Sequence, residues 1–408
     1  MKNKESRKQG SEPQLFLRSY FPDSSAPERQ VALLTRLTAL AVACSFVLSW
    51  KLWLSTRLFP LAPVSNYLPE ISYPIDYIWF LSLLILLMVI SFLPRPRKVI
   101  LLFVSLAALL SLWDQTRWQP WFYQYLFMLA AFGLLAWKEN EAASNRAALD
   151  ACRLIVVFIY LWSAVQKVNV TFVRETWPDI AAFLPSSWQT VVAHFPSYSI
   201  LVIPLIEIFI GLGLLMRRFR NGAVLAAVAT HMAILFLLVV SGENVVVWPW
   251  NIAMALFVWI LFWQNKETTA RRIVAGKKAF QVLVLILFGV LPSLSFVGLW
   301  DSYLSSALYS GNTYQTALYL GPAVLARLPA AIHPHVWQKN EPFFLDINRW
   351  AYAELRVPVY PEPRVYRQVA KRICKYAEGE RISLWIKQKP HPLTGSFESE
   401  YYDCESLD

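Results

Sequence analysis

Long apolar stretches alternate with short polar segments along residues 31–300 of the chain. A helix needs about 20 largely apolar residues to cross a membrane, because the hydrocarbon core is about 30 Å thick. Nine stretches meet or nearly meet this requirement: Thr35–Leu54, Ile75–Leu93, Val99–Trp113, Trp118–Trp137, Leu154–Val173, Tyr198–Met216, Gly222–Ser241, Val245–Trp263 and Ala279–Leu299. The third stretch is short, so a re-entrant or tilted pair formed with the fourth is an alternative to two full spans.

Lys and Arg are concentrated in every second segment between these spans. The N-terminal segment carries Lys2, Lys4, Arg7, Lys8, Arg18 and Arg29, and the later basic segments are 95–98, 138–146, 217–220 and 266–278. The intervening segments are poor in positive charge. Because Lys and Arg accumulate on the cytoplasmic side of short loops, the pattern predicts a cytoplasmic N-terminus and an extracytoplasmic tail from residue 300 onward.

Composition supports a multi-pass membrane protein. Of the 408 residues 56% are hydrophobic and 16% are charged, whereas a globular chain carries about 25% charged residues. The net charge of +11 lies in the loops between spans, so it serves topology and does not indicate nucleic-acid binding. A polar segment precedes the first span without a cleavage site, so we expect no signal peptide. The expected location is a bacterial inner membrane.

The segment from residue 301 to 408 changes composition and is expected to be a small extracytoplasmic domain. Ser305–Ser310 and Thr313–Leu320 flank the turn pair Gly311-Asn312, which predicts a β-hairpin. The predicted fold class is therefore an all-α polytopic membrane bundle of about nine transmembrane helices, followed by an α+β domain. The domains are a cytoplasmic segment (1–30), the bundle (31–300) and the outer domain (301–408).

Later elements of the outer domain have clearer signals. Helices are predicted over Leu345–Leu355 and from Pro363 to a stop before Gly379, and alternation predicts a strand over Ile382–Lys387. Cys374 and Cys404 both lie in this domain, where oxidation is permitted, so they form either a disulfide or two free thiols.

Four polar side chains lie within the fifth to eighth spans: Lys167, Glu207, His231 and Asn251. Polar groups in a span are costly and tend to face the bundle interior, so we expect a shared polar cavity that opens outward. Glu207 must be protonated or paired. Structural alternatives are that Lys167 extends to the outer headgroups, and that His231 and Asn251 only form hydrogen bonds between helices.

Spacing on the fifth span places Tyr160, Ser163 and Lys167 on one helix face. A lysine amine that is neutral in such a place is a competent general base. The eighth span opens with Trp248, Pro249 and Trp250, which suits either an aromatic belt at the membrane interface or a wall against a flat ligand such as a quinone.

Several chemistries have no signal in the sequence. A phosphate-binding glycine loop, a Cys-x-x-Cys pair, a His-Glu-x-x-His helix and a Gly-x-Ser-x-Gly turn are all absent. His333 and His335 lie two residues apart without a third ligand, so they are interpreted as surface residues and no metal is expected.

The run from Tyr160 to Asn169 (YLWSAVQKVN), followed by Glu207, an arginine-rich turn and His231, resembles the core of the vitamin K-dependent carboxylase-like proteins. Their bacterial members are often called horizontally transferred transmembrane (HTTM) proteins, and DoxX-like membrane proteins share some features. The resemblance covers residues 153–263. It implies that Lys167 takes the place of the lysine that acts as the base on the reduced vitamin.

Two functions follow as expectations. The first is a lyase-type or quinone-dependent membrane enzyme with Lys167 as base, Glu207 as proton holder or partner of Lys167, and His231 as orienting group. The expected ligands of the lipid-soluble cofactor are Tyr160, Trp248, Trp250 and Asn251. The second is a non-catalytic assembly or redox-partner subunit whose outer domain docks another protein. A transporter gains little support, because no inverted repeat is visible. Expected partners are the lipid bilayer, a lipid-soluble small molecule and an extracytoplasmic protein.

Overall fold

The computed structural model describes residues 26–138, 140–266, 268–338 and 343–407. The basic residues of segment 1–25 therefore lie outside the described residues. The helices are α2 (Ala26–Leu48), α3 (Trp50–Trp53), α4 (Ile75–Phe92), α5 (Arg97–Leu110), α6 (Pro120–Leu135), α7 (Glu141–Lys167), α8 (Trp177–Ala181), α9 (Ser186–Ala193), α10 (Val202–Leu215), α11 (Arg220–Ser241), α12 (Trp248–Phe262), α13 (Ala270–Val274), α14 (Ala279–Val284), α15 (Pro322–Arg327), α16 (Ile347–Leu355) and α17 (Pro363–Ile373). The strands are β1 (Gln315–Leu320), β2 (Val336–Trp337), β3 (Phe343–Leu345), β4 (Ile382–Lys387) and β5 (Ser399–Asp403).

Seven helical segments in the described chain are long and apolar enough to cross a membrane. They are Ala26–Leu48, Ile75–Phe92, Glu141–Lys167, Ser197–Leu215, Arg220–Ser241, Val245–Phe262 and Ala279–Val297. The third and fourth predicted spans correspond to α5 with 14 residues and α6 with 16 residues, which is short for a full crossing. The mostly helical membrane-type architecture is thus confirmed, and the count of nine crossings stays a prediction.

Large apolar side chains on the outer faces of these helices are exposed. Leu205 on α10 is 62% exposed and Leu225 on α11 is 52% exposed. A helix that keeps such residues outward needs an apolar surrounding, because water would disfavour so large an apolar surface. The exposure pattern suits contact with a lipid bilayer.

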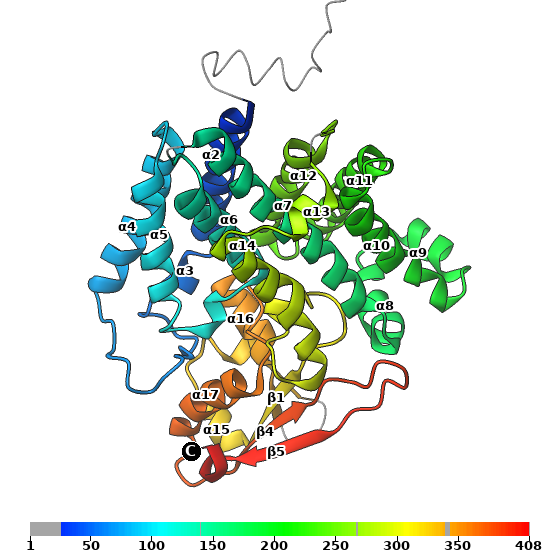
Figure 1. Ribbon diagram of the computed structural model, residues 1–408. Coiled ribbons are helices and arrows are strands. Elements are labelled where there is room, and N and C mark those ends of the chain that lie inside the picture. The colour runs from blue at the N-terminus through cyan, green and yellow to red at the C-terminus, as the bar shows by residue number, and fades with distance from the viewer. Residues whose placement is uncertain (1–25, 139, 267, 339–342, 408) are drawn as a thin grey trace, which may run out of the picture.

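The basic loops meet at one end of the bundle. Arg95 lies 2.9 Å from Glu28, at the start of α2, and 3.0 Å from Glu141, at the start of α7. Arg272 lies 2.7 Å from Asp150 of α7. Figure 1 shows that α2 begins at the end of the bundle opposite the β-sheet. The described basic loops therefore share one end, as the alternation of charge predicts.

The helix that carries Lys167 begins and ends earlier than the fifth predicted span. Asn140 caps α7 by accepting a hydrogen bond from the backbone N–H of Ala143, and the helix ends at Lys167. After Lys167, the Asn169 side chain accepts from the N–H of Phe172, which starts a separate helical turn. Lys167 is therefore the last residue of its helix, although the predicted span continues to Val173.

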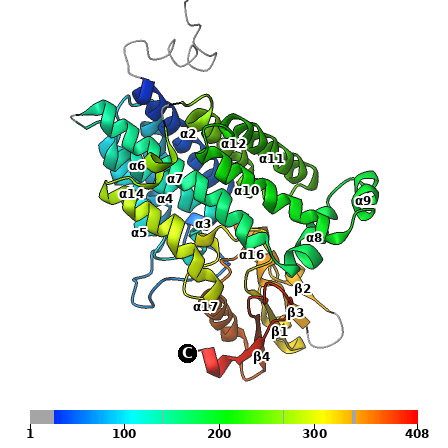
Figure 2. The ribbon, with the colours of Figure 1, turned by 45° about the vertical axis from the view of Figure 1, so that its right-hand side comes forward.

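The C-terminal domain, residues 301–407, contains a five-stranded antiparallel sheet in the order β2-β3-β1-β4-β5. Figures 1 and 2 show the sheet below the helical bundle, with α16 between them and α17 beside the sheet. The strand over Ile382–Lys387 and the helices Ile347–Leu355 and Pro363–Ile373 match their predictions.

The hairpin predicted around Gly311-Asn312 was wrong. Residues 306–310 form no strand, and β1 pairs with β3 and β4 instead. Gly311 has a φ of +73°, and a Cβ atom there would lie 2.9 Å from the backbone N of Phe172. Gly311 allows the chain to pack closely against the backbone of Phe172, and it does not form a turn between two strands.

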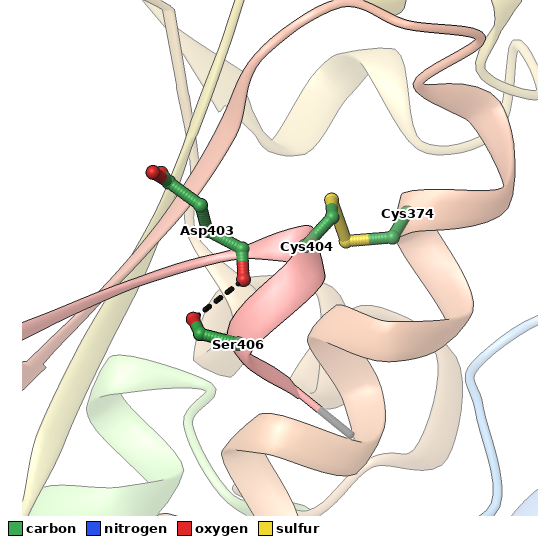
Figure 3. Close-up of a disulfide and its surroundings, with 4 residues drawn as sticks. All are labelled: Cys374, Asp403, Cys404 and Ser406. Atoms are coloured by element: carbon green, nitrogen blue, oxygen red, sulfur yellow. Dashed lines mark hydrogen bonds between the residues drawn. A yellow bond between two sulfur atoms is a disulfide. The ribbon is translucent and has the colours of Figure 1, made fainter.

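Cys374 and Cys404 form a disulfide. Figure 3 shows how it joins the end of α17 to the short turn after β5, where the hydroxyl of Ser406 donates to the backbone oxygen of Asp403. The bond fixes the last strand to the helix that packs beside it, and it decides between the two alternatives that the sequence left open.

Candidate functional site

The expected polar face of α7 exists and is covered by α10. Gly211 allows the close approach of the two helices, because a Cβ atom there would lie 2.6 Å from Leu161 Cδ2. Tyr160 and Lys167 are both buried on α7. The sequence thus brings small and apolar residues to the helix contact and leaves the polar side chains facing one another across it.

Lys167 and Glu207 form an ion pair across this contact. The ammonium Nζ lies 3.0 Å from each carboxylate oxygen of Glu207, and the two side chains are 10% and 9% exposed. Ser163 joins the pair: its Oγ accepts from Lys167 Nζ at 2.5 Å and donates to Glu207 Oε1 at 3.3 Å. The ammonium is therefore directed to α10 rather than extended along the bundle surface.

A second hydrogen-bonded chain crosses from α7 to α11 and α12. Tyr160 Oη lies 2.7 Å from His231 Nε2, and His231 Nδ1 lies 2.9 Å from Asn251 Oδ1. The Asn251 amide donates its own N–H to the backbone oxygen of Val247, so its oxygen faces the imidazole as an acceptor. This arrangement requires the proton on Nδ1 of His231 and leaves Nε2 to accept from the Tyr160 hydroxyl.

The two groups are neighbours, because Tyr160 lies one turn before Ser163 on α7 and Ser163 donates to Glu207. Helices α7, α10, α11 and α12 thus contribute to one buried set of side chains, which we call the polar cluster. Its members are Tyr160, Ser163, Lys167, Glu207, His231 and Asn251.

The two tryptophans at the start of α12 form their hydrogen bonds away from His231. Trp250 donates its indole N–H to Gln124 Oε1 of α6 at 2.8 Å, and Trp248 donates to the backbone oxygen of Glu243 at 3.0 Å. Trp250 and Asn251 are consecutive on a helix and therefore point about 100° apart. The structure brings Asn251 to the polar cluster and directs Trp250 to another helix.

Sequence reasoning missed a set of amides that attach the C-terminal domain beside Lys167. Gln166 accepts from Asn312 Nδ2 at 2.6 Å and donates to Ser295 Oγ at 2.8 Å. Asn169 donates to the backbone oxygen of Ser310 at 2.8 Å. Gln166 and Asn169 lie three residues apart, and this spacing was the available signal for a second polar face next to the first.

The pair of Lys167 and Glu207 can move a proton. Two charges in an apolar surrounding are costly to desolvate, whereas transfer of one proton from the ammonium to the carboxylate leaves two neutral groups. Ser163 contacts both partners and can stabilise either state. Such a pair supplies an acid and a base within hydrogen-bond distance of each other.

No metal site accompanies the polar cluster. Within the described ranges, no group of three or more His, Cys, Asp or Glu side chains is placed to hold a metal ion. Comparisons of the chain with protein-family models, with curated proteins and with solved structures gave no match.

Proposed function

We propose that the chain is a membrane enzyme that removes a proton from a reduced, lipid-soluble quinone-like molecule, in the manner that its resemblance to carboxylase-like HTTM proteins implies. The observation that carries the proposal is the buried pair of Lys167 and Glu207 beside Tyr160. A structural tie between helices needs only one hydrogen bond, whereas this cluster holds an acid, a base and an aligned phenol-imidazole chain.

In the proposed reaction, one proton moves in each of two steps. The ammonium of Lys167 first passes its proton to Glu207, so both groups become neutral. The Lys167 amine then takes the O–H proton of the hydroquinone, which gives the ammonium and the hydroquinone anion. The new ion pair replaces the original one, so the charge of the cluster is compensated at each step. No electron is transferred in this step.

His231, Asn251 and Tyr160 act as positioning residues in this proposal. Asn251 fixes the imidazole of His231, and the imidazole fixes the direction of the Tyr160 hydroxyl. Because the Tyr160 hydroxyl is held by His231, the phenol ring has a fixed orientation. In this proposal, one face of the ring contacts a flat ligand next to Glu207.

The test uses menadiol, the reduced form of menadione, added without oxygen to the full chain in detergent. Formation of the hydroquinone anion is followed by ultraviolet absorption, and retention of menadiol is measured separately by mass spectrometry. We expect the anion with wild type and its loss with Lys167→Arg, because arginine keeps its proton in proteins. Lys98→Arg, on the bundle surface, is the matched control. An anion signal that persists in Lys167→Arg would contradict the role of Lys167 as base.

A docking subunit is the second candidate, and one observation favours it. Strand β5 lies at the edge of the sheet, and its Tyr401 is 65% exposed. An edge strand offers backbone groups to a partner strand. In cells that lack the chain, this candidate predicts that Lys167→Ala restores function while Tyr401→Asp does not. The enzyme proposal predicts the reverse.

A further inference from the structure

A cleft of about 870 Å³ lies between the segment Ser55–Ser72 and helix α17. Gln368 of α17 closes one side by donating to the backbone oxygen of Pro63 at 3.1 Å. Figure 1 shows this segment as a long blue loop beside the orange α17, on the opposite side of the view from α10 and α11. The cleft is thus a separate feature, at the junction of the bundle and the C-terminal domain.

The lining of the cleft is strongly cationic. Helix α17 and the turn after it contribute Arg367, Lys371, Arg372 and Lys375, and Glu70 is the one acid among the described lining residues. Arg372 and Lys375 form no ion pair within the described part of the chain. The buried face of α17 points the other way, so these charges gather on the face that borders the cleft.

Three buried polar atoms at the cleft have no hydrogen-bond partner among the described residues. They are Ser55 Oγ, Arg367 Nε and Gln368 Oε1. Buried polar groups in folded proteins are almost always hydrogen-bonded, and each one left alone costs about 1–3 kcal/mol. Two of the three atoms are donors, and both come from residues that line one cavity. The Nη2 atom of Arg367 contacts Tyr402 and Glu400 of β5, so Arg367 Nε and Ser55 Oγ are the donors without a partner at the cleft, and the surrounding positive charge favours an anion there.

The lining also includes apolar side chains. Leu58 and Ile71 of the segment Ser55–Ser72 line the cleft together with Trp113, which follows α5. Helix α3 ends at Trp53 and α4 begins at Ile75, so the cleft lies where two helices reach the end of the apolar bundle. A ligand that fits both parts carries a charged group and an apolar group.

We propose that this cleft binds a phosphate-bearing amphiphile, with the phosphate toward Arg372 and Lys375 and the apolar part against Leu58 and Trp113. Arginine and lysine form strong charge-assisted hydrogen bonds with phosphate oxygens. The volume lies within the range of about 300–1,000 Å³ for small-molecule sites. The phosphate comes either from a membrane phospholipid or from a free phosphorylated compound, and the experiment separates the two.

The experiment compares the wild-type full chain with the double variant Arg372→Gln/Lys375→Gln. Native mass spectrometry counts phosphatidylglycerol retained from nanodiscs that mix it with phosphatidylcholine. Calorimetry in neutral detergent measures the binding of inorganic pyrophosphate. The control is Arg174→Gln/Arg381→Gln, which removes two exposed charges outside the cleft. Ser55→Ala is a milder second variant that removes one of the unpartnered donors, and thermal unfolding confirms that each variant is folded.

We expect the cleft variant to retain about tenfold less phosphatidylglycerol than wild type, and the control to retain the wild-type amount. Weaker pyrophosphate binding with unchanged lipid retention supports the phosphate site and assigns it to a soluble ligand. Equal binding of both probes by wild type and the cleft variant, or an equal loss in the control, overturns the proposal. Neither result depends on Lys167, so the proposed function is tested separately.

Discussion

Asn312 of the C-terminal domain donates a hydrogen bond to Gln166 Oε1 at 2.6 Å, and Gln166 directly precedes Lys167 on α7. The two amides are buried. At the end of α7, Gln166 therefore contacts the C-terminal domain, and the next residue, Lys167, contacts Glu207. The contact with the C-terminal domain and the ion pair are thus formed by consecutive residues at the end of α7.

Asn312→Ala is expected to lower the free energy of unfolding by about 1–3 kcal/mol, because it leaves Gln166 Oε1 buried without its donor. The measurement is thermal or denaturant unfolding of the full chain in detergent. Gln189→Ala is the control: it removes the two hydrogen bonds of a side-chain amide at an exposed site, where water replaces them. Equal losses in both variants would contradict the importance of the buried contact.

The polar face of α7 was predictable because helical spacing alone places Tyr160, Ser163 and Lys167 together. For Glu207 the sequence left two roles open, as holder of a proton or as the partner of Lys167. That Glu207 would face Lys167 depends on the rotation of α10 about its axis, which Gly211 permits and no local pattern specifies. Trp250 was expected beside the site, but a residue next to Asn251 on a helix must face a different neighbour.

Gly211→Val is expected to destabilise the chain by about 1–3 kcal/mol, because the added side chain forces α10 away from Leu161 of α7. Unfolding in detergent measures the loss. Gly222→Ala on α11 is the control, since a Cβ atom there meets nothing within 4 Å. We expect that variant to be neutral or slightly stabilised, as alanine favours a helix over glycine. Equal behaviour of the two variants would contradict tight packing at Gly211.

In the C-terminal domain, the elements with strong local signals were predictable. The strand Ile382–Lys387 alternates along its length, and α17 has a proline at its start. The hairpin failed because Gly311 looks like a turn residue in sequence, whereas its real role is contact with Phe172, 139 positions earlier in the chain. Long-range contacts of this kind leave no local pattern.

Replacement of Cys374 and Cys404 by serine is expected to lower the stability of the C-terminal domain by about 3–4 kcal/mol, given the separation of 30 residues that the bond closes. The double variant is compared with wild type by thermal unfolding without reductant. Cys44→Ser leaves the disulfide intact and serves as control, because Cys44 is a free and exposed cysteine. Identical unfolding of wild type and the double variant would contradict the expected stabilisation by the disulfide.

Glu362 gives the C-terminal domain a pH dependence. Burial raises the pKa of this carboxyl above its ordinary value of 4.5, although the backbone N–H of Ser302 donates to it. A raised pKa means that the folded state binds the proton more tightly. Its contribution to stability is therefore complete below pH 4.5 and is lost as the pH rises through the folded-state pKa.

Glu362→Gln removes this titration and keeps an oxygen for Ser302. We expect the stability of wild type relative to the variant to fall as the pH rises from 4.5 toward neutral. Denaturant unfolding of both proteins at several pH values measures the difference. A difference that stays constant over this range would show that burial does not control the ionisation of Glu362.

The ion pair itself can be tested without any substrate. Glu207→Leu leaves the ammonium of Lys167 buried without its counter-ion, and loss of one partner of a buried pair costs about 3–5 kcal/mol. Lys167→Met leaves the carboxylate alone, with a similar cost. The double variant Lys167→Met/Glu207→Leu removes both charges and fills the space with apolar groups, so its stability is expected near that of wild type. Unfolding of all four proteins gives the coupling energy. If the two single losses simply add in the double variant, Lys167 and Glu207 do not act as a pair.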